Sequence, residues 1–537
     1  MMTPYDKRRH SSAGRSGLPC MNDAADSAAW PAVDLDALAQ AIDMATVYDV
    51  ARVSPLDSAA KLSGRLGNQI WLKREDAQPV HSFKLRGAYN RIAKLTPAQR
   101  AAGVVAASAG NHAQGVALAG QALDIRTTIV MPETTPSIKI DAVRAYGAEV
   151  VLVGDAYDDA LAHANSLIAE RGQSFIHPYD DLDVMAGQGT VAKEILDQHR
   201  DAIDTVYIPV GGGGLVAGMA AYIKRHRPGT EIVAVEPLDS ACLHHALKAD
   251  ARVVLDQVGL FADGVAVRQI GAYPFAVARQ CVDRTIQVSV DEICAAIRAV
   301  FEDTRSVPEP AGALALAGLE RDVQARGLHG RTLVAVVSGA NMNFDRLRYV
   351  SERTALGAHR EALLAVTLPE VPGSFLQFCE LLGRRAVTEF NYRYADAAKA
   401  HIFVGVAIRD GDRERDALCD EFRKAGYEIS DLSDNDVAKV HLRHLVGGRA
   451  DALQDERLFR FEFPERPGAL MRFLQQLGGR WNISLFHYRN HGAAFGRVLA
   501  GFQVPQGELQ GFLDRLQRIG YRYWDESGNP AYRMFLR

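Results

Sequence analysis

Cysteine is scarce in this chain. Six of the 537 residues are cysteines, at positions 20, 242, 281, 294, 379 and 419. No pair of them has the C-x-x-C spacing, so the sequence indicates neither a zinc site nor a disulfide framework, and we expect no bound metal. Few, scattered cysteines are typical of a protein of the reducing cytoplasm, which is the location we expect.

The chain also lacks long apolar runs and an excess of charge of one sign. No segment approaches the ~18 consecutive apolar residues of a membrane-spanning helix. Lysine and arginine number 61 against 65 acidic residues, which gives a formal net charge of −4. Without a basic excess the sequence predicts no nucleic-acid partner, and nothing in it favours a membrane.

The N-terminal region lacks the apolar segment of a secretory signal. Its first 30 residues include Lys7, Arg8, Arg9 and Arg15 among scattered serines, glycines and prolines. A secretory signal places an apolar segment after such basic residues, and none follows here. We therefore expect residues 1–40 to be either a disordered tail or the result of a mis-called start.

Short apolar runs and helical segments alternate between residues 50 and 350. The runs 127–131 and 149–153 are separated by a helical stretch, 138–146, that Gly147 closes. Such alternation predicts an α/β fold in which helices cover a parallel sheet. Ligands of such folds bind at the carboxyl ends of the strands. The length of the chain suggests about three domains.

Four consecutive glycines, Gly211, Gly212, Gly213 and Gly214, lie between the apolar strand 206–210 and the helix 215–223. Glycine lacks Cβ, so several backbone N–H groups can approach one small anion. The helix N-terminus that follows adds partial positive charge. The pattern indicates a phosphate-binding cup.

Two ligands suit this cup. A dinucleotide would need G-x-G-x-x-G and an acid about 20 residues on. Glu236 supplies the acid, but Ala217 replaces the third glycine. A single phosphate group, as on pyridoxal phosphate, would need a lysine elsewhere. A plain turn without a ligand is less favoured, because four glycines carry a backbone-entropy cost.

A suitable lysine lies upstream, in Ser82-Phe83-Lys84-Leu85-Arg86-Gly87-Ala88. Ser82 is a candidate N-cap for the helix that follows. Lys84 would then lie in the first turn, where the helix dipole disfavours a cation and makes the neutral amine more accessible. An imine requires that neutral amine.

A second loop, Ser108-Ala109-Gly110-Asn111-His112, follows the strand 104–107 and precedes another helix. Backbone donors at a helix N-terminus can hold a carboxylate. The amide of Asn111 can bond a ring hydroxyl. His112 is as compatible with a structural role as with a catalytic one.

These motifs, with Glu309-Pro-Ala-Gly312 and Ser338-Gly-Ala-Asn341, occur in one order along the chain. Together they resemble the fold-type II (tryptophan synthase β-like) pyridoxal-phosphate enzymes, and most closely the biosynthetic threonine deaminases (threonine ammonia-lyases). The resemblance covers roughly residues 41–537. It implies conversion of L-threonine to 2-oxobutanoate and ammonia, the committing step of isoleucine biosynthesis, with L-serine as a secondary substrate.

The resemblance also implies roles for individual residues. Lys84 resembles the Schiff-base lysine and the catalytic base. The implied cofactor contacts are Phe83, Lys84, Asn111, Gly211, Gly212, Gly213, Gly214, Leu215 and Ser338. The implied substrate contacts are Ser108, Ala109, Gly110, Asn111 and His112. A serine at position 338 cannot fully protonate the pyridine nitrogen, so the ring is a weaker electron sink, which favours β-elimination over transamination.

An internal repeat follows the catalytic domain, which we place at 41–355. Residues 363–378 align with 458–473, and Gly426-Tyr427 aligns with Gly520-Tyr521. Each copy has the pattern strand, turn, helix, strand, strand, helix, strand. The copies, at 361–445 and 456–535, resemble α+β ACT-like amino-acid-sensing domains, although a scaffold that only drives oligomerisation has the same pattern.

The resemblance implies inhibition by isoleucine, opposition by valine and a homotetramer. A branched apolar effector needs an apolar cleft, and the helices after the Pro-x-x-Pro-Gly turns offer candidate residues: Phe375, Leu470, Leu474 and Leu477. Each is equally compatible with an ordinary helix core.

Other functions fit part of the pattern. A β-replacement synthase and a serine-specific dehydratase share the catalytic motifs, but the tandem repeat argues against both. A sensing protein with a degenerate catalytic domain would retain the repeat. The intact Lys84 and the unbroken cup favour an enzyme.

Overall fold

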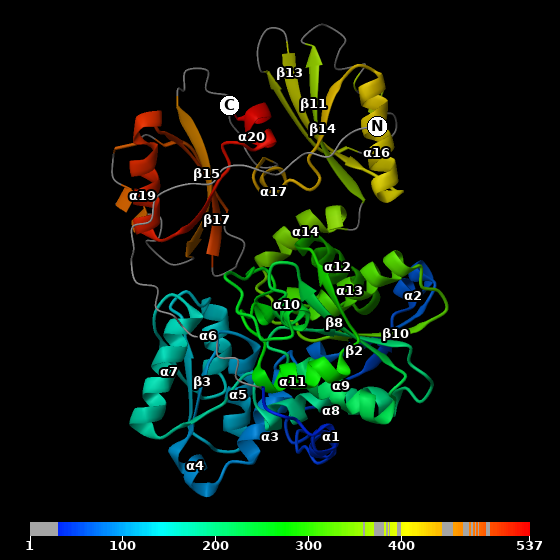
Figure 1. The fold of residues 1–537 in the computed structure, drawn as a ribbon, viewed down its shortest axis with the longest axis vertical. Helices are drawn as coiled ribbons and strands as arrows, with labels where there is room; N and C mark the ends of the chain where they lie inside the picture. Colours follow the sequence, from blue (N-terminus) through cyan, green and yellow to red (C-terminus); the bar gives the residue numbers. More distant parts are fainter. Residues whose placement is uncertain are drawn as a thin grey trace.

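The computed structural model describes residues 30–536 apart from several short segments of the C-terminal third. The segments outside the description are 358–359, 370–377, 379–380, 383–384, 386, 395–398, 443–454, 465–471, 474–475, 478–479, 482 and 490–494. Two β-sheets build the N-terminal part, and two more build a first and a second C-terminal unit above it (Figure 1).

The larger sheet of the N-terminal part has the order β1-β2-β10-β7-β8-β9. Its strands are parallel except for the edge strand β1, which runs antiparallel to β2. The strands are β1 (Leu56–Ser58), β2 (Gln69–Arg74), β10 (Thr332–Val337), β7 (Thr205–Pro209), β8 (Glu231–Pro237) and β9 (Arg284–Val288). The central strands β10, β7 and β8 are buried on both faces, so they are mostly apolar.

Helices cover both faces of this sheet, and each face has its own apolar core. One face packs against α1 (Leu35–Asp43), α8 (Leu182–Gln198), α9 (Gly214–His226), α10 (Cys242–Ala249) and α11 (Ala272–Cys281). The other face packs against α2 (Ala60–Leu66), α12 (Val290–Thr304) and α13 (Pro310–Arg326). The helix α14 (Arg346–Gly357) leads to the C-terminal units.

The smaller sheet is all parallel and has the order β5-β4-β3-β6. Its strands are β5 (Glu149–Leu152), β4 (Thr127–Met131), β3 (Val104–Ala107) and β6 (Ser174–Phe175). The accompanying helices are α3 (Lys84–Ala93), α4 (Pro97–Ala102), α5 (Asn111–Ala122), α6 (Ser137–Arg144) and α7 (Tyr157–Arg171). The expected parallel sheet is therefore divided in two.

The helix α1 corrects part of the expected tail. Residues 35–40 lie in this helix rather than in a disordered segment. Asp34 caps it by accepting hydrogen bonds from the backbone N–H groups of Asp36 and Ala37. Leu38 and Ile42 are buried against α8 and α9, so the helix belongs to the core of the larger sheet.

Each C-terminal unit contains a four-stranded antiparallel sheet, with the orders β12-β13-β11-β14 and β16-β17-β15-β18. The first unit comprises β11 (Glu361–Pro369), β12 (Val387–Tyr394), β13 (Lys399–Ala407), α16 (Gly411–Lys424), β14 (Glu428–Asp431) and α17 (Asp436–Val440). The second comprises β15 (Glu456–Pro464), β16 (Ile483–Arg489), β17 (Phe495–Gln503), α19 (Leu509–Ile519), β18 (Arg522–Asp525) and α20 (Pro530–Phe535).

The two sheets match in detail, as the internal repeat predicts. Pairing shifts by one residue at Val387/Glu389 in the first unit and at Ile483/Leu485 in the second, in corresponding strands. A single apolar core also joins the units, because α17 and α20 bury Val437 and Phe535 between them. The units therefore pack as one body (Figure 1).

Candidate functional site

The glycine block forms the turn between β7 and α9, at the carboxyl end of a central strand. The backbone N–H groups of residues 211–215 donate to no acceptor among the described residues, and all five residues are buried. Buried N–H groups are almost always paired in folded proteins. A row of unpaired ones at a helix N-terminus fits a phosphate group, which accepts several N–H bonds at once.

The walls of this cup explain why it requires glycine. A Cβ at Gly212 would lie 2.1 Å from the ring of Tyr179, and one at Gly211 would lie 2.8 Å from the Cα of Val265. Gly213 has a φ of +93°, a left-handed value that favours glycine. Each glycine is therefore fixed by a close neighbour or by its backbone angle.

The Gly212→Ala variant is expected to lose cofactor affinity, because the new methyl group displaces Tyr179 or deforms the cup. Overpacking costs ~1–3 kcal/mol, so the Kd for pyridoxal phosphate should rise at least ~5-fold. Titration of the apoprotein measures this. Gly229→Ala is the control, since its Cβ would meet nothing within 4 Å. An unchanged Kd in Gly212→Ala would show that no ligand depends on the cup.

Lys84 is the first residue of α3 and is half-buried. Phe83, not Ser82, occupies the N-cap position and makes no side-chain cap, so the expected serine cap is wrong. The Lys84 Nζ lies 3.2 Å from the carbonyl oxygen of Pro178. Burial lowers the pKa of Lys84 to about 8, although the carboxyl of Glu309 opposes the shift. The neutral amine is thus accessible near physiological pH.

Asn111 begins α5, and its amide is held from two sides. Its Oδ1 accepts from the Nδ2 of Asn341 at 2.7 Å, and its Nδ2 donates to the Oε1 of Glu309 at 2.6 Å. An amide nitrogen carries two hydrogens. One N–H of Asn111 therefore remains for a ligand.

The loop before α5 has unpaired donors of its own. The backbone N–H groups of Ala109, Asn111 and His112 donate to no described residue. The N–H of Ser108 donates to the carbonyl of Val130 and so is not free for a carboxylate, while that of Gly110 lies 3.3 Å from the Ser108 Oγ. Of the backbone N–H groups expected to bind an anion at residues 108–112, only those of Ala109, Asn111 and His112 have no partner among the described residues.

His112 has the structural role that the sequence left open. Its Nε2 donates to the carbonyl oxygen of Ile176 at 2.8 Å. Burial lowers the pKa of His112 to about 3, and the cation of Lys84 adds to the shift. A ring that is neutral at physiological pH and bonded to a carbonyl cannot act there as a general acid.

Ser338 follows β10 and lies beside the lysine segment. Its backbone oxygen accepts from the N–H of Phe83, and its Oγ donates to the carbonyl of Ala311 at 3.2 Å. The neighbouring Ser82 Oγ is buried and has no partner among the described residues. The backbones of Ser82 and Gly339 are bridged, so both serines lie where the chain brings Lys84 and the Ser338 motif together.

Glu236 does not serve a dinucleotide. Its two carboxylate oxygens accept from the backbone N–H groups of Leu243 and His244, at 2.7 and 2.8 Å. The carboxyl thus caps α10 instead of facing a ribose. This removes the acid that a dinucleotide fingerprint requires.

Two residues of the site, Tyr179 and Glu309, were not identified from the sequence. Tyr179 lines the cup from a loop after β6, and Glu309 precedes α13 and bonds Asn111. Glu309 belongs to the motif Glu309-Pro-Ala-Gly312, so the sequence indicated that it lies near the site but not that it bonds Asn111. Among the described residues, no group of three or more histidine, cysteine, aspartate or glutamate side chains is placed to hold a metal ion.

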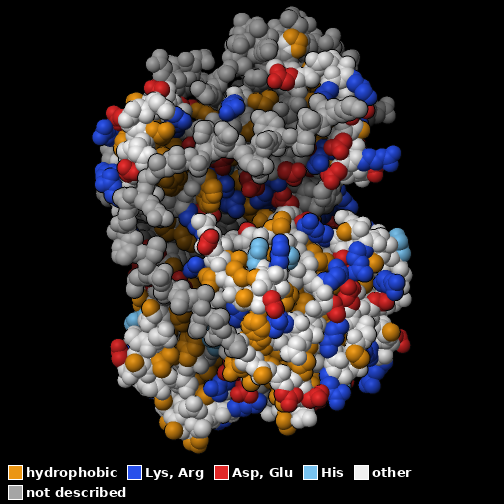
Figure 2. Space-filling model, in the orientation of Figure 1, with side chains coloured by type: hydrophobic (Ala, Val, Ile, Leu, Met, Phe, Trp, Pro, Cys, Tyr) orange, Lys and Arg blue, Asp and Glu red, His pale blue; other side chains and the backbone are white. Residues whose placement is uncertain are grey.

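The junction with the first C-terminal unit contains ion pairs formed by two buried cations, Arg353 and Lys439. On α14, Arg353 contacts Asp291 of α12 at 2.5 Å and Asp436 of α17 at 2.8 Å. The Nζ of Lys439, also on α17, lies 2.6 Å from Asp291. In the view of Figure 2, basic and acidic side chains line the hollow between the two parts. We call Arg353, Asp291, Asp436 and Lys439 the junction cluster.

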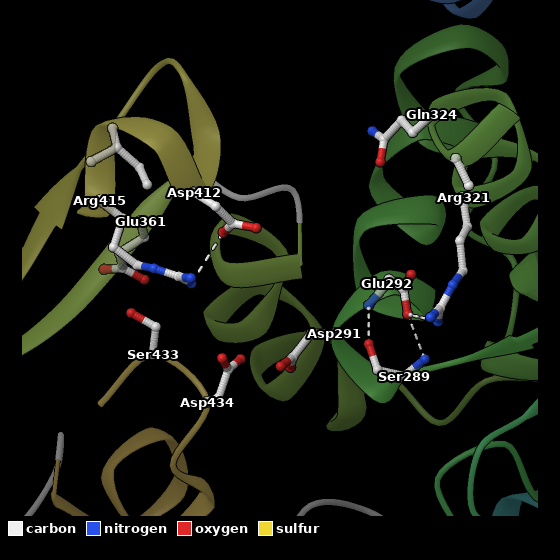
Figure 3. A pocket seen from close by; sticks show the side chains of 12 residues that line it. Ser289, Asp291, Glu292, Arg321, Gln324, Glu361, Asp412, Arg415, Ser433 and Asp434 are labelled. Carbon is white, nitrogen blue, oxygen red and sulfur yellow. Dashed lines mark hydrogen bonds and ion pairs between the residues drawn. The ribbon is translucent and has the colours of Figure 1, made fainter. Parts of the chain in front are cut away.

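A polar cavity of about 490 Å³ lies beside the junction cluster (Figure 3). Asp291 and Arg321 line it from the N-terminal part, and Arg415 and Asp434 line it from the first C-terminal unit. The largest apolar side chain of its lining is Ile408, so it is a poor seat for a branched apolar side chain.

Of the four candidate effector residues, the structure describes only Leu477. Phe375, Leu470 and Leu474 lie outside the described residues. Leu477 is buried in the core of the second C-terminal unit with Phe473 and Phe512. Its packing is that of a helix core, and its role toward an effector stays a prediction.

Comparison with known families agrees with this geometry. Residues 47–339 match the model described as "Pyridoxal-phosphate dependent enzyme". Together with the cup, this match defines the N-terminal part as a fold-type II catalytic domain that binds pyridoxal phosphate. Residues 352–442 and 447–536 each match the "C-terminal regulatory domain of Threonine dehydratase". The C-terminal units are therefore called regulatory domains below.

The chain belongs to the biosynthetic threonine dehydratase family of lyases. It is 54% identical to "L-threonine dehydratase biosynthetic IlvA" of Pasteurella multocida over 498 residues, 93% of this chain and 97% of the relative. The corresponding protein of Escherichia coli is 53% identical, and the two chains cover 93% and 96% of their lengths. The processed threonine deaminase isoform 2 of Solanum lycopersicum matches with a TM-score of 0.59 at 48% identity, over 60% of this chain and 94% of that chain.

Proposed function

We propose that the protein converts L-threonine to 2-oxobutanoate and ammonia. The observation that supports it most is the juxtaposition of three things: a half-buried lysine of lowered pKa, an amide with one free N–H, and a cup of unpaired N–H groups. The curated relatives at 49–54% identity that bear the name threonine dehydratase support the substrate. L-serine, one methyl group smaller, is proposed as a secondary substrate.

Each group of site residues has its own role in binding the cofactor, binding the substrate or moving a proton. Pyridoxal phosphate, when bound, supplies an aldehyde for an amine and a ring that withdraws electrons from Cα. Residues 211–215 hold the phosphate by backbone N–H groups, and Phe83 and Ser338 border the ring. The N–H groups of Ala109, Asn111 and His112, with the Ser108 hydroxyl and the backbone of Gly110, hold the substrate carboxylate. The Nζ of Lys84 accepts the Cα proton of threonine.

The experiment is direct. Purified protein saturated with pyridoxal phosphate is mixed with L-threonine, and 2-oxobutanoate is identified by mass and quantified. The expected result is one 2-oxobutanoate and one ammonia for each threonine consumed. Formation of a β-substituted amino acid from an added thiol, without ammonia, would assign the chain to a replacement synthase instead.

The Asn111→Ala variant is expected to weaken ring orientation without abolishing cofactor binding. One neutral hydrogen bond contributes ~0.5–1.5 kcal/mol, so the Kd for pyridoxal phosphate should rise about 2- to 12-fold and kcat should fall. Asn165→Ala, at an exposed position of α7, is the control. Unchanged kinetics in Asn111→Ala would reject its role.

We also propose that isoleucine inhibits the enzyme through the regulatory domains and that valine opposes it. Two matches to the regulatory-domain family and the apolar core shared by α17 and α20 support a tandem sensing body. A catalytic domain that begins with α1 and ends near residue 355, regulatory domains at 361–445 and 456–535, a cytoplasmic location and a homotetramer complete the proposal. Of the helices formed by the described residues, none has the length and apolar character needed to cross a bilayer.

A further inference from the structure

The carboxyl group of Glu309 is buried at the catalytic site without a cation of its own. Glu309 is 4% exposed and precedes α13, and its Oε1 accepts from the Asn111 Nδ2 at 2.6 Å. Among the described residues, no lysine or arginine forms an ion pair with it, and its Oε2 bonds no other group. Glu75 and Glu194, by contrast, are both paired with the buried Arg86, and Glu236 caps α10.

Two glycines shape the space around this carboxyl. A Cβ at Gly339 would lie 2.7 Å from the Glu309 Oε1 and 3.2 Å from the Asn111 Nδ2. A Cβ at Gly264 would lie 3.4 Å from the same oxygen and 3.0 Å from the Cβ of Ala311. The backbone N–H of Glu309 also donates to the carbonyl of Gly339. The chain therefore keeps the Glu309–Asn111 contact close-packed on both sides.

The charged groups that surround Glu309 come from four elements. Lys84 lies on α3, Asp263 on η2 (Asp263–Val265), Lys139 on α6 and Arg346 on α14. Lys139 and Arg346 are themselves paired with Asp263, at 2.7 and 3.2 Å. Burial raises the pKa of Glu309 to about 7; the charge of Asp263 adds to the shift, while Asn111, Lys139 and Arg346 oppose it.

We propose that Glu309 is a positioning residue of the catalytic site, which fixes the amide of Asn111 and so aims its second N–H at the cofactor ring. The proposal deepens the proposed function and rests on it for the identity of the reaction. Asn341 holds the Oδ1 of Asn111, and Glu309 holds one Nδ2 hydrogen, so the amide cannot turn over.

Ionisation of this carboxyl would alter the site in a definite direction. Below a pH of about 7 Glu309 is protonated, so Oε1 still accepts from Asn111 while the site carries no added negative charge. Above that pH the carboxylate favours the charged form of Lys84, because it raises the pKa of that amine. Glu309 thus links the pH of the solution to the proton on Lys84.

The test compares full-length Glu309→Gln and Glu309→Ala proteins with the wild type. Glutamine retains the carbonyl acceptor and the shape but cannot ionise, while alanine removes the contact. Three quantities are measured: the Kd for pyridoxal phosphate in titrations of apoprotein, the visible absorbance of the holoprotein between pH 6 and 9, and kcat and KM over that range. Glu320→Gln is the matched control, because Glu320 lies on α13, which Glu309 precedes, and forms an ion pair with Arg65.

In Glu309→Gln we expect a Kd within ~2-fold of the wild type and the loss of the wild-type absorbance and kcat transition near pH 7. In Glu309→Ala we expect a Kd about 2- to 12-fold higher and a fall in kcat larger than any change in KM. Wild-type affinity and wild-type pH dependence in both variants would overturn the proposal. The Kd and absorbance do not require turnover of threonine, so these results stand apart from the test of the proposed function.

Discussion

Replacing Lys84 by alanine is expected to abolish turnover of threonine while leaving the fold intact. The variant loses both the amine that anchors the cofactor and the base that accepts the Cα proton. A positioned base alone contributes ~10²–10⁴-fold, so kcat should fall at least ~10³-fold when both functions are lost. The variant should also lack the visible absorbance of the wild-type holoprotein.

Lys94→Ala provides the control for this experiment. Lys94 is the C-cap of the same helix, and its side chain forms an exposed ion pair with Asp183, an interaction worth ~0–1 kcal/mol. Its kcat should equal that of the wild type. A Lys84→Ala protein with more than about a tenth of wild-type activity would mean that another residue is the base.

Arg353→Gln is expected to weaken inhibition by isoleucine with little change in kcat for threonine. Arg353 joins Asp291 of the catalytic domain to Asp436 of the first regulatory domain, and it is 5% exposed. An allosteric effect requires a coupling free energy between the effector site and the catalytic site. This coupling is typically ~1–3 kcal/mol, which corresponds to about 5- to 150-fold in effector affinity. The concentration for half-inhibition should therefore rise within that range.

The controls separate a loss of allosteric coupling from a loss of protein stability. Removing one partner of a buried ion pair can cost ~3–5 kcal/mol of stability, so Tm is measured for each protein. Lys439→Gln removes the second cation of the junction cluster and should act in the same direction. Arg348→Gln, exposed on the same helix, should leave inhibition unchanged. Wild-type inhibition in Arg353→Gln and Lys439→Gln proteins of wild-type Tm would exclude the junction cluster as the coupling element.

A shorter chain tests the same idea from the other side. A protein ending near residue 355 should retain some conversion of threonine but be insensitive to isoleucine, although the apolar surface it exposes will reduce its solubility. If isoleucine inhibited that chain at the same concentration as the full protein, the regulatory domains would not be the sensors.

Local signals made much of the fold predictable. The strands at 104–107 and 127–131 have the predicted bounds, because each is a short apolar run between turn residues. The glycine block is predictable for the same reason: its N–H groups, its helix and its strand are contiguous in sequence. The repeat also predicted that the two regulatory domains share one succession of strands, and their two sheets have corresponding strand orders.

The features that the sequence did not reveal depend on distant or misleading neighbours. Asn111 and Glu309 are 198 residues apart, so no local pattern joins them. The acid at Glu236 stands at the spacing of a dinucleotide site, yet both its oxygens are used by α10. The helix α1 has an aspartate cap and an apolar face, but its residues 35–40 were expected to belong to the tail.

The central claim is that pyridoxal phosphate is held by Lys84 in a cup built from residues 211–215. The most direct measurement is reduction of the holoprotein with borohydride, proteolysis and mass spectrometry of the peptides. The account predicts a pyridoxyl group on the peptide that contains Ser82-Phe83-Lys84, at one group per chain. A pyridoxyl group on a different lysine, with Lys84 unmodified, would contradict it.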